Sequence, residues 1–279
     1  MDDQQARLKV SAAILSKNAE NHIEPCLRSI TWVDEIVLVD GHSTDRTCEI
    51  AEQYGVRVVP HDFVSFPAER AFALEQTTND WVLSLDTDMI VPVALAEEIK
   101  ETMRKGPEYD GYLIRCLNHF LGREIRHCSW FDHRFLRFFN KTKGCYDLSY
   151  TVLDGFNLQG TVGKLNNFLV HHQTESLEEY VQKMGRLFAP KTADEYIMKG
   201  VKITPGNVPW YFLLKPFLVF LHKYVYKRGF LDGIPGLIIS LNSAYLYYCC
   251  YAIVWDRQRG TPSYKLERYL GKRENGKQV

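Results

Sequence analysis

The first hundred residues alternate short apolar runs with longer segments of helical character, and this alternation limits the possible fold more than any other feature. The apolar runs, rich in β-branched and small residues, cover 8–15, 35–40, 56–59 and 81–85. The helical segments are expected at about 43–54, with Ser43 or Thr44 as the cap, and at 67–76 and 92–105. Strands that alternate with such helices form a mostly parallel sheet with right-handed crossovers. We therefore predict an α/β fold.

Two aspartates stand directly after the fourth apolar run. Residues 81–85 read as a buried strand, and Asp86-Thr87-Asp88 follows it. Ligands of an open α/β sheet bind outside the carboxyl ends of its strands. Carboxylates at that edge suit a divalent cation, Mg²⁺ or Mn²⁺, which could neutralise a diphosphate leaving group. Taken alone, the same pattern also fits an acidic turn that binds nothing.

Polar residues also follow the first two runs, and an arginine lies on the predicted helix before the fourth. Ser16-Lys17-Asn18 ends the first run and Asp40 ends the second. Asp40 could accept a hydrogen bond from a nucleobase or a ribose hydroxyl, or it could only shape the turn with Gly41. Arg70 carries a planar, permanently charged guanidinium that suits phosphate, although most helix arginines are simply solvated.

Together these segments resemble family 2 glycosyltransferases with a GT-A fold. The matching stretches are Ser11–Asn18, Glu35–Asp45, Arg70–Leu74 and Leu85–Asp88. The similarity extends to about residue 256 and is closest to the lipopolysaccharide core and cell-envelope branch. The stretches that resemble this branch are Leu136–Phe139 after Trp130, Gly160–Gly163, His171 before Leu177–Tyr180, and Gly229–Gly233. The resemblance implies transfer of a sugar from a nucleotide diphosphate, with UDP expected, to a cell-envelope glycolipid.

The resemblance also assigns roles to single residues of the donor site. Asp40 would bind the base, with Ser16 and Asn18 beside it at the same sheet edge. Arg70 would lie near the diphosphate. Asp86 and Asp88 would hold the ribose and the metal ion, with Asp88 as the main metal ligand.

Two further residues have roles that the sequence leaves open. His171 could be an additional metal or phosphate contact, or a structural histidine beside His172. Arg137 could contact the donor phosphate or the acceptor, or form a salt bridge within the domain. The predicted strands 110–117 and 134–139 are rich in arginine and aromatic residues, so we expect them to face a substrate cleft.

An inverting transferase needs a general base that takes the proton from the acceptor hydroxyl. The envelope branch typically has Val-His-Glu about eight residues before a Gly-x-Val-Gly, and this chain has Val152-Leu153-Asp154 before Gly160. Asp replaces Glu and Leu replaces His, but a carboxylate remains. Asp154 is therefore the predicted catalytic base, with Asp147 and Asp132 as the alternatives.

The composition changes near residue 205. Residues 208–255 are aromatic and aliphatic. The segment 234–255 contains no charged residue and is long enough to span a bilayer. The tyrosines and the lysines at 215 and 223 are more typical of helices at a membrane surface. We predict a GT-A domain over 1–205 and a helical extension over 206–279 that attaches to the membrane through 208–256. A packed subdomain, a homodimer surface and a true span are the alternatives.

Overall composition excludes several other classes of protein. Formal net charge is zero, which argues against a nucleic-acid surface. Seven cysteines without a C-x-x-C argue against a zinc ribbon or a disulfide framework. The polar N-terminus lacks a signal-peptide core, so we expect a cytoplasmic enzyme at the inner face of the cytoplasmic membrane. A nucleotide-sugar-binding scaffold and a transferase for capsule or glycoprotein precursors remain alternatives. A phosphohydrolase is disfavoured, because its D-x-D would follow the first strand.

Overall fold

The computed structural model describes residues 8–148, 155–174 and 176–260. The chain forms two compact units. The first comprises the described residues of Met1–Tyr180 and Leu221–Leu241, and the second comprises those of Val181–Phe220 and Asn242–Val279. The predicted division into 1–205 and 206–279 stays a prediction.

The centre of the first unit is a β-sheet of nine strands, counted over the described residues, in the order β3-β2-β1-β4-β8-β6-β11-β5 with β7 beside β6. Its amino-terminal half is parallel and consists of β1 (Val10–Ser16), β2 (Glu35–Asp40), β3 (Arg57–Pro60) and β4 (Trp81–Asp86). This half agrees with the apolar runs in the sequence to within two residues at each end. The predicted α/β fold class is confirmed.

The other half makes the sheet mixed. It consists of β5 (Met89–Ile90), β6 (Gly111–Phe120), β7 (Arg123–Ile125), β8 (Arg134–Asn140) and β11 (Val162–Thr174). Strand β8 runs antiparallel to both β4 and β6, whereas β11 is parallel to β6. Strands β9 (Gly144–Tyr146) and β10 (Phe156–Leu158) form a separate hairpin sheet.

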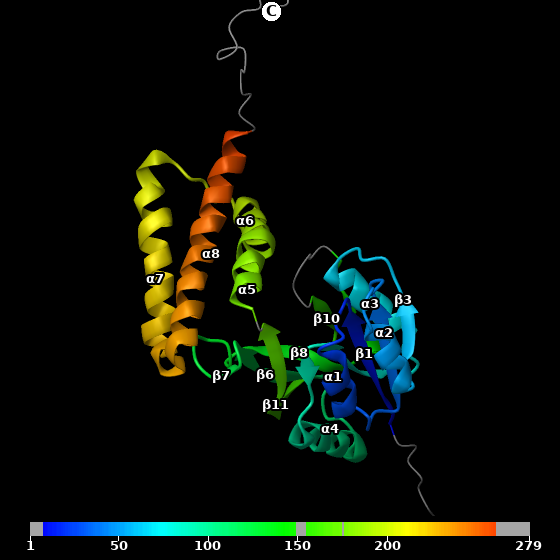
Figure 1. The fold of residues 1–279 in the computed structure, drawn as a ribbon. Coiled ribbons are helices and arrows are strands. Elements are labelled where there is room, and N and C mark those ends of the chain that lie inside the picture. Colours follow the sequence, from blue (N-terminus) through cyan, green and yellow to red (C-terminus); the bar gives the residue numbers. More distant parts are fainter. Residues whose placement is uncertain (1–7, 149–154, 175, 261–279) are drawn as a thin grey trace, which may run out of the picture. The chain divides into compact units, whose positions relative to one another are not determined.

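Helices cover both faces of the sheet. Successive strand residues point to opposite sides, so these apolar strands carry apolar side chains on both faces. The helices α1 (Ile23–Ser29), α2 (Thr47–Gln53) and α4 (Val93–Lys105) enclose one core, which contains Ile14, Leu38 and Leu83. Helix α3 (Phe66–Gln76) covers the other face, whose core contains Ala13 and Val82. Figure 1 shows α3 and α4 on opposite sides of the sheet.

The start of α2 differs from the expectation. The predicted caps, Ser43 and Thr44, lie in the preceding loop, and the helix begins at Thr47 with Arg46 at the N-cap position. Ser43 donates hydrogen bonds to Asp40, and Thr44 donates to the side-chain oxygen of Asn18. These residues therefore order the loop instead of the helix end.

The second unit is helical. Among its described residues, Tyr251 of α8 (Gly233–Arg259) is 1% exposed and packs against Tyr196 of α6 (Ala189–Met198) and Tyr211. The remaining helical segments along the chain are α5 (Leu177–Lys183), α7 (Lys215–Leu221), the π-helices Met184–Phe188, Trp210–Leu214 and His222–Tyr226, and the 3-10 turns Lys141–Lys143, Pro205–Asn207 and Gly229–Asp232.

Within the described chain, one helical stretch, residues 229–259, has the length and apolar composition needed to cross a membrane. One third of its most apolar window is buried inside the protein. Buried core helices of soluble proteins share this length and composition.

A buried carboxylate connects residues 221–241 to the rest of the first unit. Asp232 accepts hydrogen bonds from the backbone N–H groups of Arg126 (3.3 Å) and His127 (2.9 Å), and lies 2.8 Å from the His127 ring Nδ1. Gly236 packs so closely that a Cβ atom there would lie 1.9 Å from the carbonyl oxygen of Gly229. Any larger residue at 236 would break this contact.

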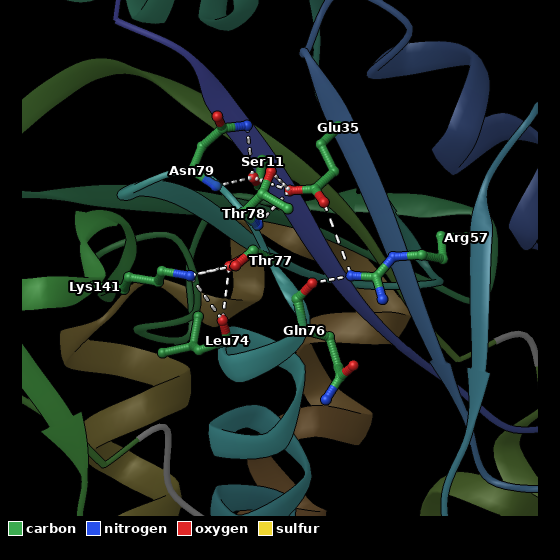
Figure 2. A network of polar contacts seen from close by, with 9 residues as sticks. All are labelled: Ser11, Glu35, Arg57, Leu74, Gln76, Thr77, Thr78, Asn79 and Lys141. Atoms are coloured by element: carbon green, nitrogen blue, oxygen red, sulfur yellow. Dashed lines mark hydrogen bonds and ion pairs between the residues drawn. The ribbon is translucent and has the colours of Figure 1, made fainter.

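A polar network fastens the amino ends of the parallel strands (Figure 2). Glu35 on β2 accepts from the Ser11 hydroxyl on β1 and from the backbone N–H of Thr78 (2.8 Å). Burial alone would raise the Glu35 pKa, but these hydrogen bonds lower it, so Glu35 is a carboxylate at neutral pH. Lys141 closes the network at the end of α3, where its ammonium donates to the carbonyl of Leu74 (3.0 Å) and the hydroxyl of Thr77 (2.9 Å).

Replacing Lys141 with Met should lower the free energy of unfolding by about 1.5–3 kcal/mol, the usual contribution of a hydrogen bond to a charged group. The loss arises because the last carbonyls of α3 lose their donor. Urea unfolding followed by circular dichroism measures it.

Lys143→Met is the matched control, since Lys143 is an exposed lysine of the same 3-10 turn. We expect the control to change stability by less than about 0.5 kcal/mol. Equal effects of both substitutions would contradict a capping role for Lys141.

Candidate active site

The predicted site residues of the first two strands lie at one sheet edge. Strands β1 and β2 are parallel, with Ser16 directly opposite Asp40. The Ser16 hydroxyl donates to Asp40 Oδ1 over 2.7 Å. The strand ends therefore come together as the sequence predicted.

Asp40 is buried, 3% exposed, and organises the loop that follows it. The backbone N–H of Ser43 donates to its Oδ2 (2.7 Å), and the Ser43 hydroxyl donates to its Oδ1 (2.6 Å). Burial would raise the Asp40 pKa, but these bonds and the one from Ser16 lower it, so the group stays ionised. Its role in binding a nucleobase stays a prediction.

Asn18 joins the loops after β1 and β2. Its side-chain oxygen accepts from the backbone N–H of Thr44 (2.8 Å), and its own N–H donates to the Ser43 hydroxyl (2.8 Å). Asn18 has a φ of +47°, and Asn is among the few residues that adopt this left-handed conformation readily. The two loops thus form one polar surface at the sheet edge, the ledge, which contains Ser16, Asn18 and Asp40.

The first aspartate of the D-x-D motif is held between two buried arginines. Arg70 on α3 donates from Nη2 to Asp86 Oδ1 (2.7 Å) and from Nη1 to the Ser84 hydroxyl (3.1 Å). Arg137 on β8 donates from Nη2 to Asp86 Oδ2 (3.2 Å). Both arginines are about 5% exposed, with Arg70 at 6% and Arg137 at 5%. Two positive charges therefore stand beside the carboxyl end of β4.

These charges determine the protonation state of Asp86. Its removal from water would raise its pKa, but the guanidinium of Arg70, and then that of Arg137, outweigh this effect and hold the pKa at about 2. Each carboxylate oxygen retains a second lone pair for a further contact. Arg137 thus forms the salt bridge that was one of its two predicted roles, while the contact with donor or acceptor stays a prediction.

The second aspartate lies beside His171. Strand β5, which follows Asp88, pairs antiparallel with β11 and places Met89 opposite His171. His171 Nε2 is 3.3 Å from Asp88 Oδ2. The other oxygen, Asp88 Oδ1, is buried and has no hydrogen-bond partner among the described residues.

His171 is oriented by a residue that the sequence did not reveal. Its Nδ1 lies 2.8 Å from the side-chain oxygen of Asn118, which sits directly opposite on β6. An amide oxygen only accepts, so Nδ1 carries the proton and, in the neutral ring, Nε2 presents a lone pair toward Asp88. Metal-binding histidines are commonly oriented in this way.

These donors suit a divalent cation shared with a phosphate ligand. Over the described residues, no three His, Cys, Asp or Glu side chains surround a common point as a closed metal site. Asp88 and His171 instead supply one carboxylate and one ring nitrogen side by side, with Oδ2 and Nε2 3.3 Å apart. Mg²⁺ in nucleotide enzymes often uses one or two protein ligands and takes the rest from water and substrate phosphates.

The candidates for the catalytic base are placed only in part. Asp154 lies outside the described residues. Asp132 is exposed and pairs with the Lys227 ammonium over 2.9 Å, while the backbone N–H of Asp147 donates to the Gly155 carbonyl over 2.9 Å. The assignment of Asp154 as the base stays a prediction.

Two residues of the cluster were missed from the sequence, for different reasons. Ser84 precedes Asp86 by two positions, so the strand period alone places both on one face and could have found it. Asn118 has no such signal, because only the register of β6 against β11 brings it to His171.

The two aspartates of the motif should differ in what they contribute to stability. Asp86→Ala should reduce the free energy of unfolding by about 3–5 kcal/mol, because it removes a carboxylate that faces two buried guanidinium groups. Asp88→Ala should cost less than about 1 kcal/mol, since one of its oxygens has no partner to lose. Chemical unfolding of the two variants tests this difference.

Asp86→Asn separates charge from shape, and we expect it to lie between the wild type and Asp86→Ala. If Asp88→Ala destabilised the protein as much as Asp86→Ala, Asp88 would be a structural residue.

Several known proteins are similar to this chain. Residues 11–152 match the model of the family described as Glycosyl transferase family 2. The lipopolysaccharide core biosynthesis glycosyltransferase LpsC of Rhizobium meliloti is 26% identical over 90% of this chain and 93% of its own. An uncharacterized glycosyltransferase of Rickettsia bellii is 27% identical over 85% of this chain and 83% of its own.

Among solved structures, S. aureus TarS aligns with a TM-score of 0.49 and 15% identity over 91% of this chain and 92% of that chain. The family match covers just over half of the sequence and includes the ledge, Arg70 and both aspartates. The chain therefore belongs to glycosyl transferase family 2 and is a glycosyltransferase.

Proposed function

We propose that the protein is an inverting, metal-dependent transferase that moves a sugar from a nucleoside diphosphate, UDP first, to a cell-envelope glycolipid. The observation that carries this proposal is the state of Asp88, whose Oδ2 lies 3.3 Å from His171 Nε2 and whose buried Oδ1 has no hydrogen-bond partner among the described residues. It lies two residues from a carboxylate that faces two buried arginines. The similarity to LpsC supports a lipopolysaccharide core as the acceptor.

Asp88 and His171 would hold the divalent cation, Mg²⁺ or Mn²⁺, with Asp86 available at the same strand end. When bound, this cation would neutralise charge on the diphosphate leaving group. Asn118 holds the His171 ring in the orientation that the site needs.

The remaining residues of the cluster act on the donor and the acceptor. The ledge of Asp40, Ser16 and Asn18 would receive the base and the ribose. Arg70 adds positive charge near the diphosphate and fixes Asp86. The acceptor oxygen would then form a bond to the anomeric carbon, the bond to the diphosphate would break, and Asp154 would take the hydroxyl proton.

The helical extension supports attachment to a membrane. Several large apolar side chains of 208–255 are more than one third exposed: Val208, Trp210, Leu213, Leu214, Phe217, Leu218, Val225, Tyr226, Phe230, Leu231, Ile234, Leu241, Tyr245, Tyr248 and Trp255. Exposed apolar area of this extent is unusual for a soluble monomer. We place the enzyme at the inner face of the cytoplasmic membrane, where a glycolipid acceptor would be within reach.

UDP should bind the wild-type protein tightly with Mn²⁺ and at least tenfold more weakly with a chelator, because the cation would join Asp88 to the diphosphate. Isothermal titration with UDP, GDP, CMP and ADP measures this and identifies the nucleotide. Failure of all four to bind to folded protein would contradict the proposed donor site.

Variants test the metal ligands separately from the nucleotide ledge. His171→Ala and Asp88→Ala should abolish the effect of Mn²⁺ but keep the weak, metal-free binding. Asn118→Leu should weaken Mn²⁺ binding about 10–100-fold, as expected for a residue that orients a metal ligand. An unchanged Mn²⁺ effect in Asp88→Ala would exclude the metal role of this residue.

Vesicles containing phosphatidylglycerol should retain the wild-type protein in a co-sedimentation assay. The double variant Leu213→Ser/Phe217→Ser should lose at least tenfold in affinity, since it removes two side chains that are 70% and 55% exposed. Met198→Ser is the control, because Met198 is 79% exposed but lies on α6, outside 208–256.

If the wild type did not bind vesicles and formed dimers that the double variant disrupts, the surface would be a subunit interface. That outcome would contradict membrane attachment through these residues.

A further inference from the structure

Two arginines face each other across neighbouring strands of the sheet. Arg115 on β6 lies directly opposite Arg134 on the antiparallel strand β8. Residues opposite each other project from the same face, with Cβ atoms roughly 5 Å apart, and like charges in this arrangement are destabilising. The sheet therefore holds two positive charges together in a position that carries a cost.

No carboxylate in the described part of the chain offsets these charges. The salt bridges of the neighbouring arginines join Arg126 to Glu124 and Arg137 to Asp86, whereas Arg115 and Arg134 form no ion pair with a described residue. Arg115 Nε is buried and lacks a hydrogen-bond partner among the described residues. This N–H group is one that an incoming anion could satisfy.

Both guanidinium groups are nevertheless held in place. Arg115 Nη2 donates to the carbonyl of Asn166 over 3.1 Å, and Arg134 Nη1 donates to the carbonyl of Leu165 over 2.8 Å. These carbonyls lie on β11, in the bulge where its register against β6 shifts between Lys164 and Phe168. One short segment thus orients both arginines.

The bulge is itself anchored from α4. Glu98 Oε1 accepts from the backbone N–H of Asn166 (2.7 Å), and Oε2 accepts from the backbone N–H of Asn167 (2.9 Å). Both asparagine side chains donate to the same carboxylate. A rigid support of this kind is typical of a binding site and is not needed by a pair of solvated surface arginines.

The Phe131 ring completes the surroundings of the pair. The Arg115 guanidinium lies 5.0 Å from the centre of this ring, and that of Arg126 lies 5.8 Å from it. An aromatic face beside a cation is attractive and excludes water from one side. Arg126 shares this ring but, unlike Arg115, is neutralised by Glu124.

We infer that Arg115 and Arg134 bind an anionic group, a phosphate or a carboxylate, of the acceptor. Arginine forks suit such groups through paired N–H donors. Arg134 precedes Arg137 by three residues on β8, roughly 10 Å along a strand, and Arg137 contacts Asp86 of the donor site. The anion would therefore lie on the order of 10 Å from the donor site, and this identification rests on the proposed function.

Glucose 6-phosphate and inorganic phosphate are suitable probes, with glucose as the uncharged control and titration at constant ionic strength. The wild type should bind the two phosphates at least tenfold more tightly than glucose. Arg115→Met and Arg134→Met should each abolish this preference, and Arg134→Lys should restore only part of it. The Arg126→Met variant should retain the preference for phosphate, because Arg126 stacks on the same ring but is already paired with Glu124.

The same variants titrated with UDP and Mn²⁺ distinguish the acceptor from the donor. If Arg115→Met and Arg134→Met bind UDP with an affinity within about twofold of the wild type, the pair belongs to an acceptor site. Loss of UDP binding in these variants would show that the pair serves the donor and would overturn the inference. No preference for phosphate in the wild type, or equal losses in Arg126→Met, would also overturn it. If Arg115→Met fails to fold, Arg134→Met decides. Failure of the wild type to bind UDP would instead refute the proposed function, and the phosphate titration would be unaffected.

Discussion

The ion pairs that hold Asp86 between Arg70 and Arg137 are the interaction on which the site depends. They join α3, the end of β4 and the antiparallel strand β8 at one point, and so connect the parallel half of the sheet to the mixed half. Two buried arginines beside one carboxylate keep it ionised at any physiological pH. Asp88, two residues later, has an oxygen without a hydrogen-bond partner in the described part of the chain. One aspartate of the motif thus forms buried ion pairs, and the other is the metal ligand of the proposed function.

The two edges of the parallel half differ in the hydrogen bonding of their polar groups. At the amino edge, Glu35 and Lys141 have their polar atoms satisfied by neighbouring strands and by the end of α3. The carboxyl edge contains the buried carboxylate of Asp40, the left-handed Asn18 and an oxygen of Asp88 to which no described residue bonds. Asp40 and Asn18 are therefore hydrogen-bonded like the groups of the amino edge, and Asp88 Oδ1 is the group that differs from them.

Much of the fold and part of the site could be predicted because they depend on local patterns. The strand period and the strand–helix alternation located β1 to β4, and parallel pairing then required Ser16, Asp40 and Asp86 to share an edge. The loop after Asp40 was misjudged, since Ser43 had two possible partners and the buried carboxylate competed successfully with the helix end. Strands β5 and β11 were not foreseen, because they are defined by long-range pairing and not by a periodic pattern.

The sequence alone determined the family, the α/β class and the identity of the aspartates and arginines at the strand ends, because these follow from short motifs and the period of the strands. Only the tertiary structure decided which of these groups meet. The register of β6 against β11 brings Asn118 to His171, and the register of β6 against β8 places Arg115 opposite Arg134. The physical reason is that a strand's period fixes the face on which each side chain lies, whereas the neighbour it meets depends on a pairing between segments distant in the chain.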